Sequence, residues 1–322
     1  MNHLLSVEDL DRAAIERIVS QAERFSEVSD REIKKVPALR GRMVLNLFYE
    51  SSTRTRSSFE LAAKRLSADV VNFAASGSSV EKGESLKDTV LTLSAHKPDA
   101  IVLRTPWAGA SELVSKWCSA AIVNAGDGKH EHPTQALLDL YTLRRRLGRI
   151  DGASIWIVGD VAHSRVARSN IIAFRRMGAK VTVAGPPTLI PRAIEELGCE
   201  VRYTLEDLPS ADVVYALRMQ RERMSEAWVP SLREYASWYQ INRRRLSPHQ
   251  VLMHPGPVNR GIELSGEVVD SPQAVITAQV ESGGVVRMAV LYQLLAGARE
   301  HGQRDERAPF AGAAAIAGER LG

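Results

Sequence analysis

The feature that most constrains this chain is an alternation of short apolar runs with amphipathic stretches along almost its whole length. The apolar runs that predict buried strands in the first half lie at 42–48, 69–73, 99–103 and 120–124. The stretches that predict helices lie at 7–28, with Ser6 as N-cap, and at 57–66, 84–96 and 110–118. Strands that alternate with helices form a parallel sheet covered by helices. The pattern therefore predicts an α/β fold.

The same alternation restarts after a helix predicted at 134–147, which ends in a basic turn and Gly148. Further strands are predicted at 153–158, 179–184, 212–216 and 250–253, and further helices at 164–177, 190–198 and, after Gly283-Gly284, at 285–298. We expect two doubly wound parallel-sheet domains joined by bridging helices. The expected boundaries are 1–132, completed by a C-terminal helix at about 285–300, then 133–284, and a mobile tail at 301–322.

Charge and composition exclude several classes of protein. Lysine and arginine number 42 against 38 aspartates and glutamates, an excess of +4 that is too mild to predict a polyanionic partner. Arg144–Arg146 lack the interleaved aromatics of a nucleic-acid surface, and Arg243–Arg245 are interpreted as a solvated loop. No apolar run approaches the ~18 residues of a membrane span. Cys118 and Cys199 form no CxxC pair, and the N-terminus lacks a secretory signal. We expect a cytoplasmic enzyme.

Polar side chains follow the predicted strands, where open parallel sheets bind ligands. They are mostly cationic and lie at 51–56, 78–82, Arg104, 130–135, Arg165, 218–221 and 254–260. The segment at 50–56, Glu-Ser-Ser-Thr-Arg-Thr-Arg, lies between the strand at 42–48 and the helix expected at 57–66, and its hydroxyls and two guanidinium groups suit a phosphate group. The alternative is an ordinary N-cap followed by a solvated basic turn. No GxxxxGK[ST] sequence is present, so this is not a P-loop.

Two longer motifs resemble the signatures of the aspartate and ornithine carbamoyltransferases, in matching order and spacing. They are FYESSTRTRSSFE at 48–60, which resembles the carbamoyl-phosphate signature, and HPTQ at 132–135. The resemblance implies a carbamoyl-phosphate site made by Ser52, Thr53, Arg54, Thr55, Arg104, His132 and Gln135. In it the hydroxyls and Arg54 hold the phosphate, His132, Thr55 and Arg104 donate to the carbamoyl oxygen, and Gln135 orients the amide.

Three further segments resemble the aspartate branch of the family. In the loop at 76–88 the resemblance implies that Ser78 and Lys82 enter the site of a neighbouring subunit and bind carbamoyl phosphate there, with Ser79 as the alternative to Ser78. Lys82 is also implied to bind aspartate. The segment at 217–223 implies aspartate binding by Arg218 and Gln220, joined by Arg165. The segment HPGPVNRG at 254–261 implies backbone contacts from Pro255, Gly256 and Pro257. Two arginine forks suit the two carboxylates of aspartate, and the HCLP segment of ornithine enzymes is missing.

The resemblance implies transfer of the carbamoyl group from carbamoyl phosphate to L-aspartate, an early step of de novo pyrimidine biosynthesis. Its catalytic residues would be His132, Arg54, Thr55 and Lys82, with no cofactor. His130 and His132 flank Glu131, but zinc needs further ligands, so we expect no metal. A homotrimer with shared sites is implied, alone or with a regulatory chain or a dihydroorotase. The alternatives are a carbamoyltransferase for ornithine or a related amino acid, a non-catalytic scaffolding member of the family, and a nucleic-acid binder.

Overall fold

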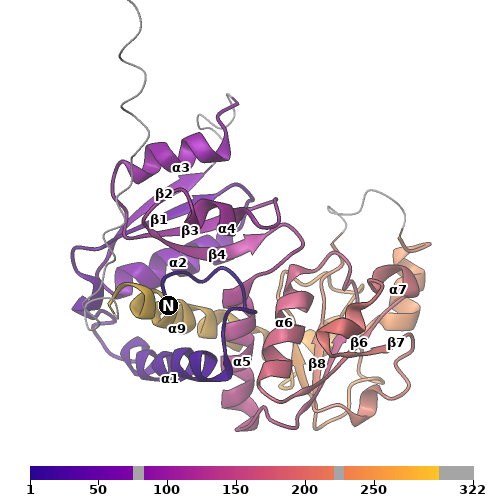
Figure 1. The fold of residues 1–322 in the computed structure, drawn as a ribbon. Coiled ribbons are helices and arrows are strands. Elements are labelled where there is room, and N and C mark those ends of the chain that lie inside the picture. The colour runs from indigo at the N-terminus through magenta and orange to yellow at the C-terminus, as the bar shows by residue number, and fades with distance from the viewer. Residues whose placement is uncertain (75–82, 221–227, 297–322) are drawn as a thin grey trace, which may run out of the picture.

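The computed structural model describes residues 1–74, 83–220 and 228–296, which form two parallel sheets side by side (Figure 1). The first sheet has the order β2-β1-β3-β4, and its strands are β1 Met43–Phe48, β2 Asp69–Ala74, β3 Ala100–Thr105 and β4 Ala121–Asp127. β1 pairs in parallel register with β2 on one side and β3 on the other. Its apolar residues Val44, Leu45, Leu47 and Phe48 are buried, as expected for a central strand covered on both faces.

The second sheet has the order β7-β6-β5-β8-β9, also with parallel pairing throughout. Its strands are β5 Ser154–Val158, β6 Lys180–Ala184, β7 Glu200–Arg202, β8 Val213–Ala216 and β9 Val251–Met253. The predicted α/β class with two parallel sheets is confirmed. In the described part of the chain, every helix is too short or too polar to cross a membrane.

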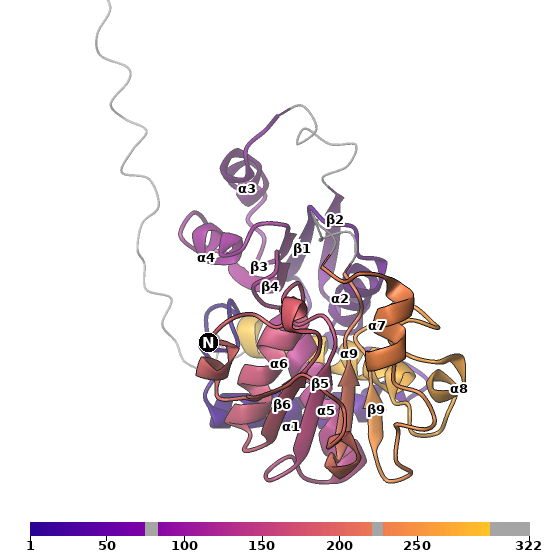
Figure 2. The same cartoon turned by 90° about the vertical axis from the view of Figure 1, so that its right-hand side faces the viewer.

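Helices cover each sheet, and two of them connect the halves. The helices of the first half are α1 Arg12–Ser29, α2 Thr53–Arg65, α3 Leu86–Ser94 and α4 Ala110–Ser115. Those of the second half are α6 Arg165–Arg176, α7 Leu232–Tyr239 and α8 Gly266–Val269, of which α7 and α8 lie on the side of the sheet that β9 borders (Figure 2). Between the sheets stands α5 Pro133–Leu147, and α9 Ile276–Leu295 packs against α1, α2 and α5 (Figure 1).

One continuous apolar core runs through both halves by way of these two helices. Leu137 and Leu140 of α5 and Val286 and Leu291 of α9 are fully buried in a cluster that also holds strand residues from both sheets. A helix that is apolar on nearly every face is a buried helix. The two sheets are therefore fixed to one another by packing around α5 and α9.

Two predicted helices differ from the structure for local reasons. The helix expected over 7–28 begins at Arg12, because Asp11 rather than Ser6 is the N-cap and accepts a 2.6 Å hydrogen bond from the Ala14 amide. The helix expected over 190–198 is wrong. Two short 3₁₀ turns, Pro187–Leu189 and Ile194–Leu197, take its place, since Pro191 interrupts the helical ladder and Ala193 has a φ of +60°.

Other boundaries move outward. Helix α2 begins at Thr53 rather than 57, and α9 begins at Ile276 rather than 285, so that Gly283-Gly284 lies inside the helix. Strand β7 and helices α7 and α8 were not predicted. The solvated-loop interpretation of Arg243–Arg245 is wrong for Arg245, whose guanidinium donates to the carbonyls of Ser237 (2.8 Å) and Gln240 (2.7 Å) at the end of α7. The tail 301–322 lies outside the described residues.

Candidate active site

The strand orders place a switch point in each sheet. From β1 the chain moves outward to β2 and then returns to β3 on the other side of β1, and the same reversal occurs at β5, between β6 and β8. Such reversals open a crevice at the carboxyl ends of the strands. The segments that follow β1, β3, β5 and β8 line a single cavity of about 930 Å³. The two crevices therefore open into one shared site.

Every described residue that the sequence predicted for the site lines this cavity. They are Ser52, Thr53, Arg54, Thr55, Arg104, His132, Gln135, Arg165, Arg218, Gln220, Pro255, Gly256 and Pro257. The remaining two, Ser78 and Lys82, lie outside the described residues, as does the alternative Ser79. Residues that are more than 200 positions apart in sequence thus meet in one place, because the carboxyl ends of the strands of both sheets border the same cavity.

The amino end of α2 opens into the cavity. Ser52 is the N-cap but its hydroxyl makes no capping hydrogen bond, and Thr53, Arg54 and Thr55 form the first turn. The first amides of a helix have no intrahelical acceptor and carry a partial positive charge. This turn therefore offers backbone N–H groups, hydroxyls and a guanidinium to the same volume, which is the chemistry that a phosphate group needs.

Arg54 and Arg218, one from each half, both line the cavity. Partial burial, followed by repulsion from Arg218, lowers the pKa of Arg54. An arginine remains protonated at neutral pH despite such a shift, because its ordinary pKa is so high. Arg218 is held by its own segment, since its Nη1 lies 3.4 Å from Gln220 Oε1. The backbone N–H of Gln220 in turn donates to Asp160 Oδ2. An anion bound between Arg54 and Arg218 would relieve their repulsion.

Glu50 links the other two arginines of the site. Its Oε2 lies 3.4 Å from Nε of Arg104 and accepts a hydrogen bond from Nη2 of Arg165, whose side chain is 4% exposed. Arg104 also donates from Nη1 to the carbonyl of Ala125 at 3.1 Å. Because Arg165 comes from the second half and Glu50 follows β1, this carboxylate bridges the cavity. Glu50 was part of the recognised motif, but its own role was not predicted.

Gly126 makes room for the same two guanidinium groups. A Cβ atom at this position would lie 2.8 Å from Arg165 Nη1 and 3.2 Å from Arg104 Nη1, and its φ of +119° disfavours any side chain. This residue was not predicted, since a lone glycine after a strand has no distinctive pattern.

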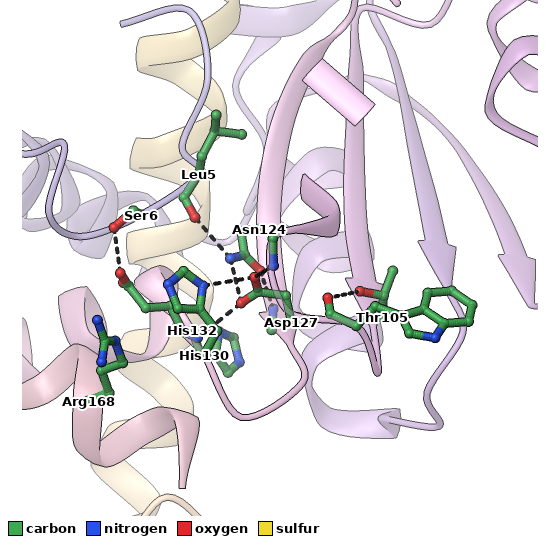
Figure 3. A network of polar contacts seen from close by, with 12 residues as sticks. Leu5, Ser6, Thr105, Asn124, Asp127, His130, His132 and Arg168 are labelled. Atoms are coloured by element: carbon green, nitrogen blue, oxygen red, sulfur yellow. Dashed lines mark hydrogen bonds and ion pairs between the residues drawn. The ribbon is translucent and has the colours of Figure 1, made fainter. Parts of the chain in front are cut away.

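A hydrogen-bond network fixes the turn at 128–130, directly after β4 and Gly126 (Figure 3). Asp127 accepts from Asn124 Nδ2 (3.0 Å) and from the Glu131 amide (3.0 Å), and pairs with Nδ1 of His130 at 3.0 Å. This pairing raises the pKa of His130. His130 is thus engaged in holding the turn. In the described residues no group of three or more histidine, cysteine or acidic side chains is placed to hold a metal ion.

His132 and Gln135 reach the cavity from the start of α5. His132 is the N-cap residue, its side chain is buried, and its amide donates to Ser169 Oγ at 2.8 Å. Pro133 follows as the first helical residue, where its missing N–H costs nothing. Gln135 lies in the first turn, and its Nε2 donates to Asp139 Oδ1 at 3.1 Å. The imidazole and the carboxamide are therefore held on a rigid element.

The loop after β9 packs against Arg54. The Gly256 amide donates to Nδ1 of His254 at 2.8 Å, and Nε2 of His254 lies 3.2 Å from Glu263 Oε1. Because Nδ1 accepts, the proton of the neutral ring lies on Nε2, and burial lowers the pKa of His254. A Cβ at Gly256 would lie 2.6 Å from Arg54 Nη1. The loop backbone is thus in close contact with the guanidinium of the α2 turn.

Some polar residues at the base of the cavity were not predicted. Ser58, Gln279 and Arg287 line the cavity, and the buried Asp139 lies behind it, bonded to Gln135 and Gln279. Arg287 donates to Ser58 Oγ at 2.8 Å and lies 5.0 Å from the centre of the Phe59 ring. A charged residue in an otherwise apolar stretch of a helix is the signal that could have identified Asp139, within 136–143, and Arg287, within 285–295.

Two parallel sheets whose switch points share one arginine-lined cavity define an α/β protein built to hold small anions. A family model described as the carbamoyl-phosphate-binding domain of aspartate/ornithine carbamoyltransferase matches residues 2–145. A second, described as the aspartate/ornithine-binding domain, matches residues 151–294. The chain belongs to the aspartate/ornithine carbamoyltransferase family.

Relatives and solved structures agree with this assignment. The chain is 57% identical over 304 residues to an aspartate carbamoyltransferase catalytic subunit of Salinispora arenicola, with 92% of this chain and 99% of the relative covered. The catalytic subunit of the M. jannaschii aspartate transcarbamoylase is 38% identical, with a TM-score of 0.82 and coverage of 94% and 100%. The Trypanosoma cruzi aspartate transcarbamoylase in complex with N-(phosphonacetyl)-L-aspartic acid is 34% identical, with a TM-score of 0.83 and coverage of 91% and 96%.

Proposed function

We propose that this protein is an aspartate carbamoyltransferase, which converts carbamoyl phosphate and L-aspartate into N-carbamoyl-L-aspartate and phosphate. The observation that carries the proposal is one cavity in which the amino end of α2, with Arg54, faces Arg165 and Arg218 of the other half. This arrangement can hold a phosphate at one side and two carboxylates at the other. The relatives named above carry the same activity in their names, and a T. cruzi structure contains carbamoyl phosphate and aspartate together.

Carbamoyl phosphate would bind at the α2 turn. Ser52, Thr53, Arg54 and Thr55 would hold the phosphate through hydroxyls, the guanidinium and backbone N–H groups. His132, Thr55 and Arg104 would donate to the carbamoyl oxygen, whose negative charge grows as the tetrahedral centre forms. Gln135 would accept from the carbamoyl amide. Each group is placed on an element that is already fixed, so little reorganisation accompanies the reaction.

Aspartate would bind between Arg165, Arg218 and Gln220, with the two guanidinium forks on its two carboxylates. Its neutral α-amino nitrogen then attacks the carbamoyl carbon. The new C–N bond forms first and gives the tetrahedral centre, the C–O bond to phosphate breaks as that centre collapses, and the proton lost by the amine leaves with the phosphate. Two anions can be brought together here because the site holds several cations.

The assembly belongs to the same proposal. Ser78 and Lys82 would reach the site of a neighbouring subunit in a homotrimer, on its own or with a regulatory chain or a dihydroorotase. The reaction would serve de novo pyrimidine biosynthesis in the cytoplasm. Support for a shared site comes from the resemblance of residues 76–88 to the corresponding loop of the aspartate branch.

An assay with both amines tests the proposed substrate. We expect carbamoylation of L-aspartate and none of L-ornithine, with phosphate released in equal amount. Turnover of ornithine alone would transfer the protein to the other branch of the family. A complete lack of turnover with either amine would favour a non-catalytic role.

Mixing inactive subunits tests the shared site. His132→Ala and Lys82→Ala chains are each expected to be inactive, but a mixed trimer contains an interface at which both residues are intact, so part of the activity should return. Fluorescently tagged chains verify that exchange took place. Activity that stays absent after verified exchange contradicts a site built from two subunits.

A further inference from the structure

Asp139 is a fully buried carboxylate one helical turn after Gln135. It accepts four side-chain hydrogen bonds, two on each oxygen. Oδ1 accepts from Gln135 Nε2 (3.1 Å) and Gln279 Nε2 (2.8 Å), and Oδ2 accepts from Asn170 Nδ2 (2.9 Å) and Tyr215 Oη (2.7 Å). An ionised carboxylate is an acceptor only, with room for about four such bonds. Its hydrogen-bonding capacity is therefore fully used.

The bond from Gln135 determines which end of that side chain meets a ligand. A carboxamide has a donor end and an acceptor end that differ only by a half-turn of the group. Asp139 takes the donor end, so Gln135 presents its carbonyl oxygen to the cavity. The NH₂ end of a carbamoyl group offers only N–H donors, so it needs the carbonyl oxygen of Gln135 as an acceptor. The reversed carboxamide would set donor against donor.

The same carboxylate oxygen orients a second carboxamide. Gln279 of α9 donates its Nε2 to Asp139 Oδ1 and accepts at Oε1 from the His254 amide at 3.0 Å. His254 opens the loop that packs on Arg54. Asp139 Oδ1 thus orients two carboxamides. One is Gln135, which would meet the carbamoyl group, and the other is Gln279, which holds the start of the loop that packs on Arg54.

We infer that Asp139 is a positioning residue for carbamoyl phosphate, because its carboxylate holds Gln135 with the carbonyl oxygen toward the ligand and, through Gln279, supports the loop at 254–257. The inference rests on the proposed function, in which Gln135 accepts from the carbamoyl amide. Asp139 acts through these side chains and does not itself touch the substrate.

The surroundings make this carboxylate sensitive to mild acid. Burial raises the pKa of Asp139 to about 6, against the opposing effect of the hydrogen bonds from Gln279, Asn170 and Tyr215. The titratable groups that face it are Tyr215 on β8, whose pKa burial raises well above its usual range, and Arg287 on α9, whose pKa burial lowers to about 10. The facing side chains on α5, α6 and α9 that donate to it are otherwise neutral carboxamides.

Protonation would remove one accepting position from Asp139. One donor must then turn away, and the donors that line the cavity are Gln135 and Gln279, both on Oδ1. The form that orients Gln135 is therefore the carboxylate, which is present above the folded-state pKa and is lost as the pH falls through about 6.

The first test is Asp139→Asn, with Asn170→Ala as the matched control. The NH₂ group of asparagine can only donate hydrogen bonds. Where it meets Gln135 it favours the carboxamide turned by half a turn, with the carbonyl oxygen of Gln135 toward residue 139 and its NH₂ group toward the cavity. At about pH 8 we expect KM for carbamoyl phosphate to rise about 10- to 100-fold in Asp139→Asn, with a much smaller change in KM for aspartate. Asn170→Ala removes one donor to Oδ2 of the same carboxylate and leaves the bond from Gln135 to Oδ1 in place, so it should keep the wild-type KM for carbamoyl phosphate.

A folded Asp139→Asn enzyme with wild-type KM for carbamoyl phosphate overturns the inference. Equal losses for both substrates also overturn it, since they indicate a general structural effect. An inactive wild-type enzyme would instead remove the proposed function, so the two failures are distinguishable.

The second test needs no variant at position 139 and decides the matter if Asp139→Asn fails to fold. Tyr215 lowers the pKa of Asp139, so Tyr215→Phe raises it. The low-pH loss of kcat/KM for carbamoyl phosphate should therefore lie at higher pH in Tyr215→Phe, by roughly half a pH unit or more. Comparison of the two enzymes cancels the substrate's own titration. Coincident pH profiles overturn the inference.

Discussion

At the scale of single residues, the site depends on arginines that come together from both halves of the chain. Arg165 and Arg104 share Glu50, whereas Arg54 and Arg218 repel each other across the cavity. A cation held near another cation gains from any anion that comes between them, and the gain is larger where water is partly excluded. Affinity for small anions is thus built into the arrangement of the side chains.

Arg54→Ala should lower kcat/KM for carbamoyl phosphate by about two to four orders of magnitude while the thermal unfolding midpoint changes little, because the variant removes a charge-assisted contact to the phosphate. Steady-state kinetics and a thermal melt provide the measurements. Arg56→Ala is the matched control, since Arg56 lies in the same turn of α2 but does not line the cavity. Equal activity of the two variants would contradict the phosphate role of Arg54.

Gly126→Ala should raise KM for aspartate at least about tenfold, because the new methyl group displaces Arg165 and Arg104. The φ of +119° adds backbone strain. Gly41→Ala controls for strain alone, since Gly41 has a φ of +77° and a methyl group there would meet no atom within 4 Å. It should destabilise the fold slightly and leave KM unchanged. If both variants lose aspartate affinity, close packing at Gly126 is not the cause.

The sequence predicted the cavity residues that belong to contiguous motifs, such as Ser52–Thr55 and His132–Gln135, because each motif carries its chemistry within a few positions. Gly126 and Asp139 could not be found in this way. A glycine acquires its role from arginines that arrive from elsewhere in the chain, and a buried aspartate acquires its role from four partners on four elements. Such roles arise only when the elements pack.

At the scale of elements, α9 contains two adjacent glycines that differ in their surroundings. A Cβ atom added at Gly284 would meet only Arg65 Nη1, at 3.9 Å, which is an ordinary contact. At Gly283 it would overlap Arg287 Nη1, and Leu138 lies 3.4 Å away. Arg287 has little freedom to move, because it is buried and bonded to Ser58.

These surroundings predict opposite effects for the same substitution. Gly284→Ala should stabilise the protein by about 0.5–1 kcal/mol, because alanine loses less backbone entropy in a helix. Gly283→Ala should destabilise it by about 1–3 kcal/mol through overpacking. Urea unfolding of both variants beside the wild type measures the difference. Stabilisation by both would mean that Arg287 relocates at little cost.

The same two glycines explain why the sequence placed the start of α9 too late. Glycine disfavours a helix interior, so Gly283-Gly284 suggested a boundary, whereas close packing of α9 on α5 and Arg287 favours small residues there. The error at 190–198 is of another kind, since an amphipathic pattern outweighed Pro191. Tertiary packing determined where α9 begins, and local backbone geometry prevented a helix at 190–198.

At the scale of the whole molecule, the cavity lies between two halves that both contribute arginines to its lining. Inorganic phosphate should therefore raise the thermal unfolding midpoint by more than chloride does at equal ionic strength, because it bridges the α2 turn and the arginines of the second half. Scanning calorimetry over a range of phosphate concentrations measures the effect. Arg54→Ala should remove most of the difference between the two salts. Identical midpoints in both salts would contradict a specific anion site.

The position of α9 has a consequence for how the chain is made. This helix, Ile276–Leu295, is synthesised late but packs against α1 and α2 of the first half. At about 5–20 residues per second, the ribosome needs roughly 8 to 34 seconds to extend the chain from the end of β4 to the end of α9. During that interval the apolar surfaces of α1 and α2 have emerged without their partner. The packing of the amino-terminal half is therefore completed only after α9 has been synthesised.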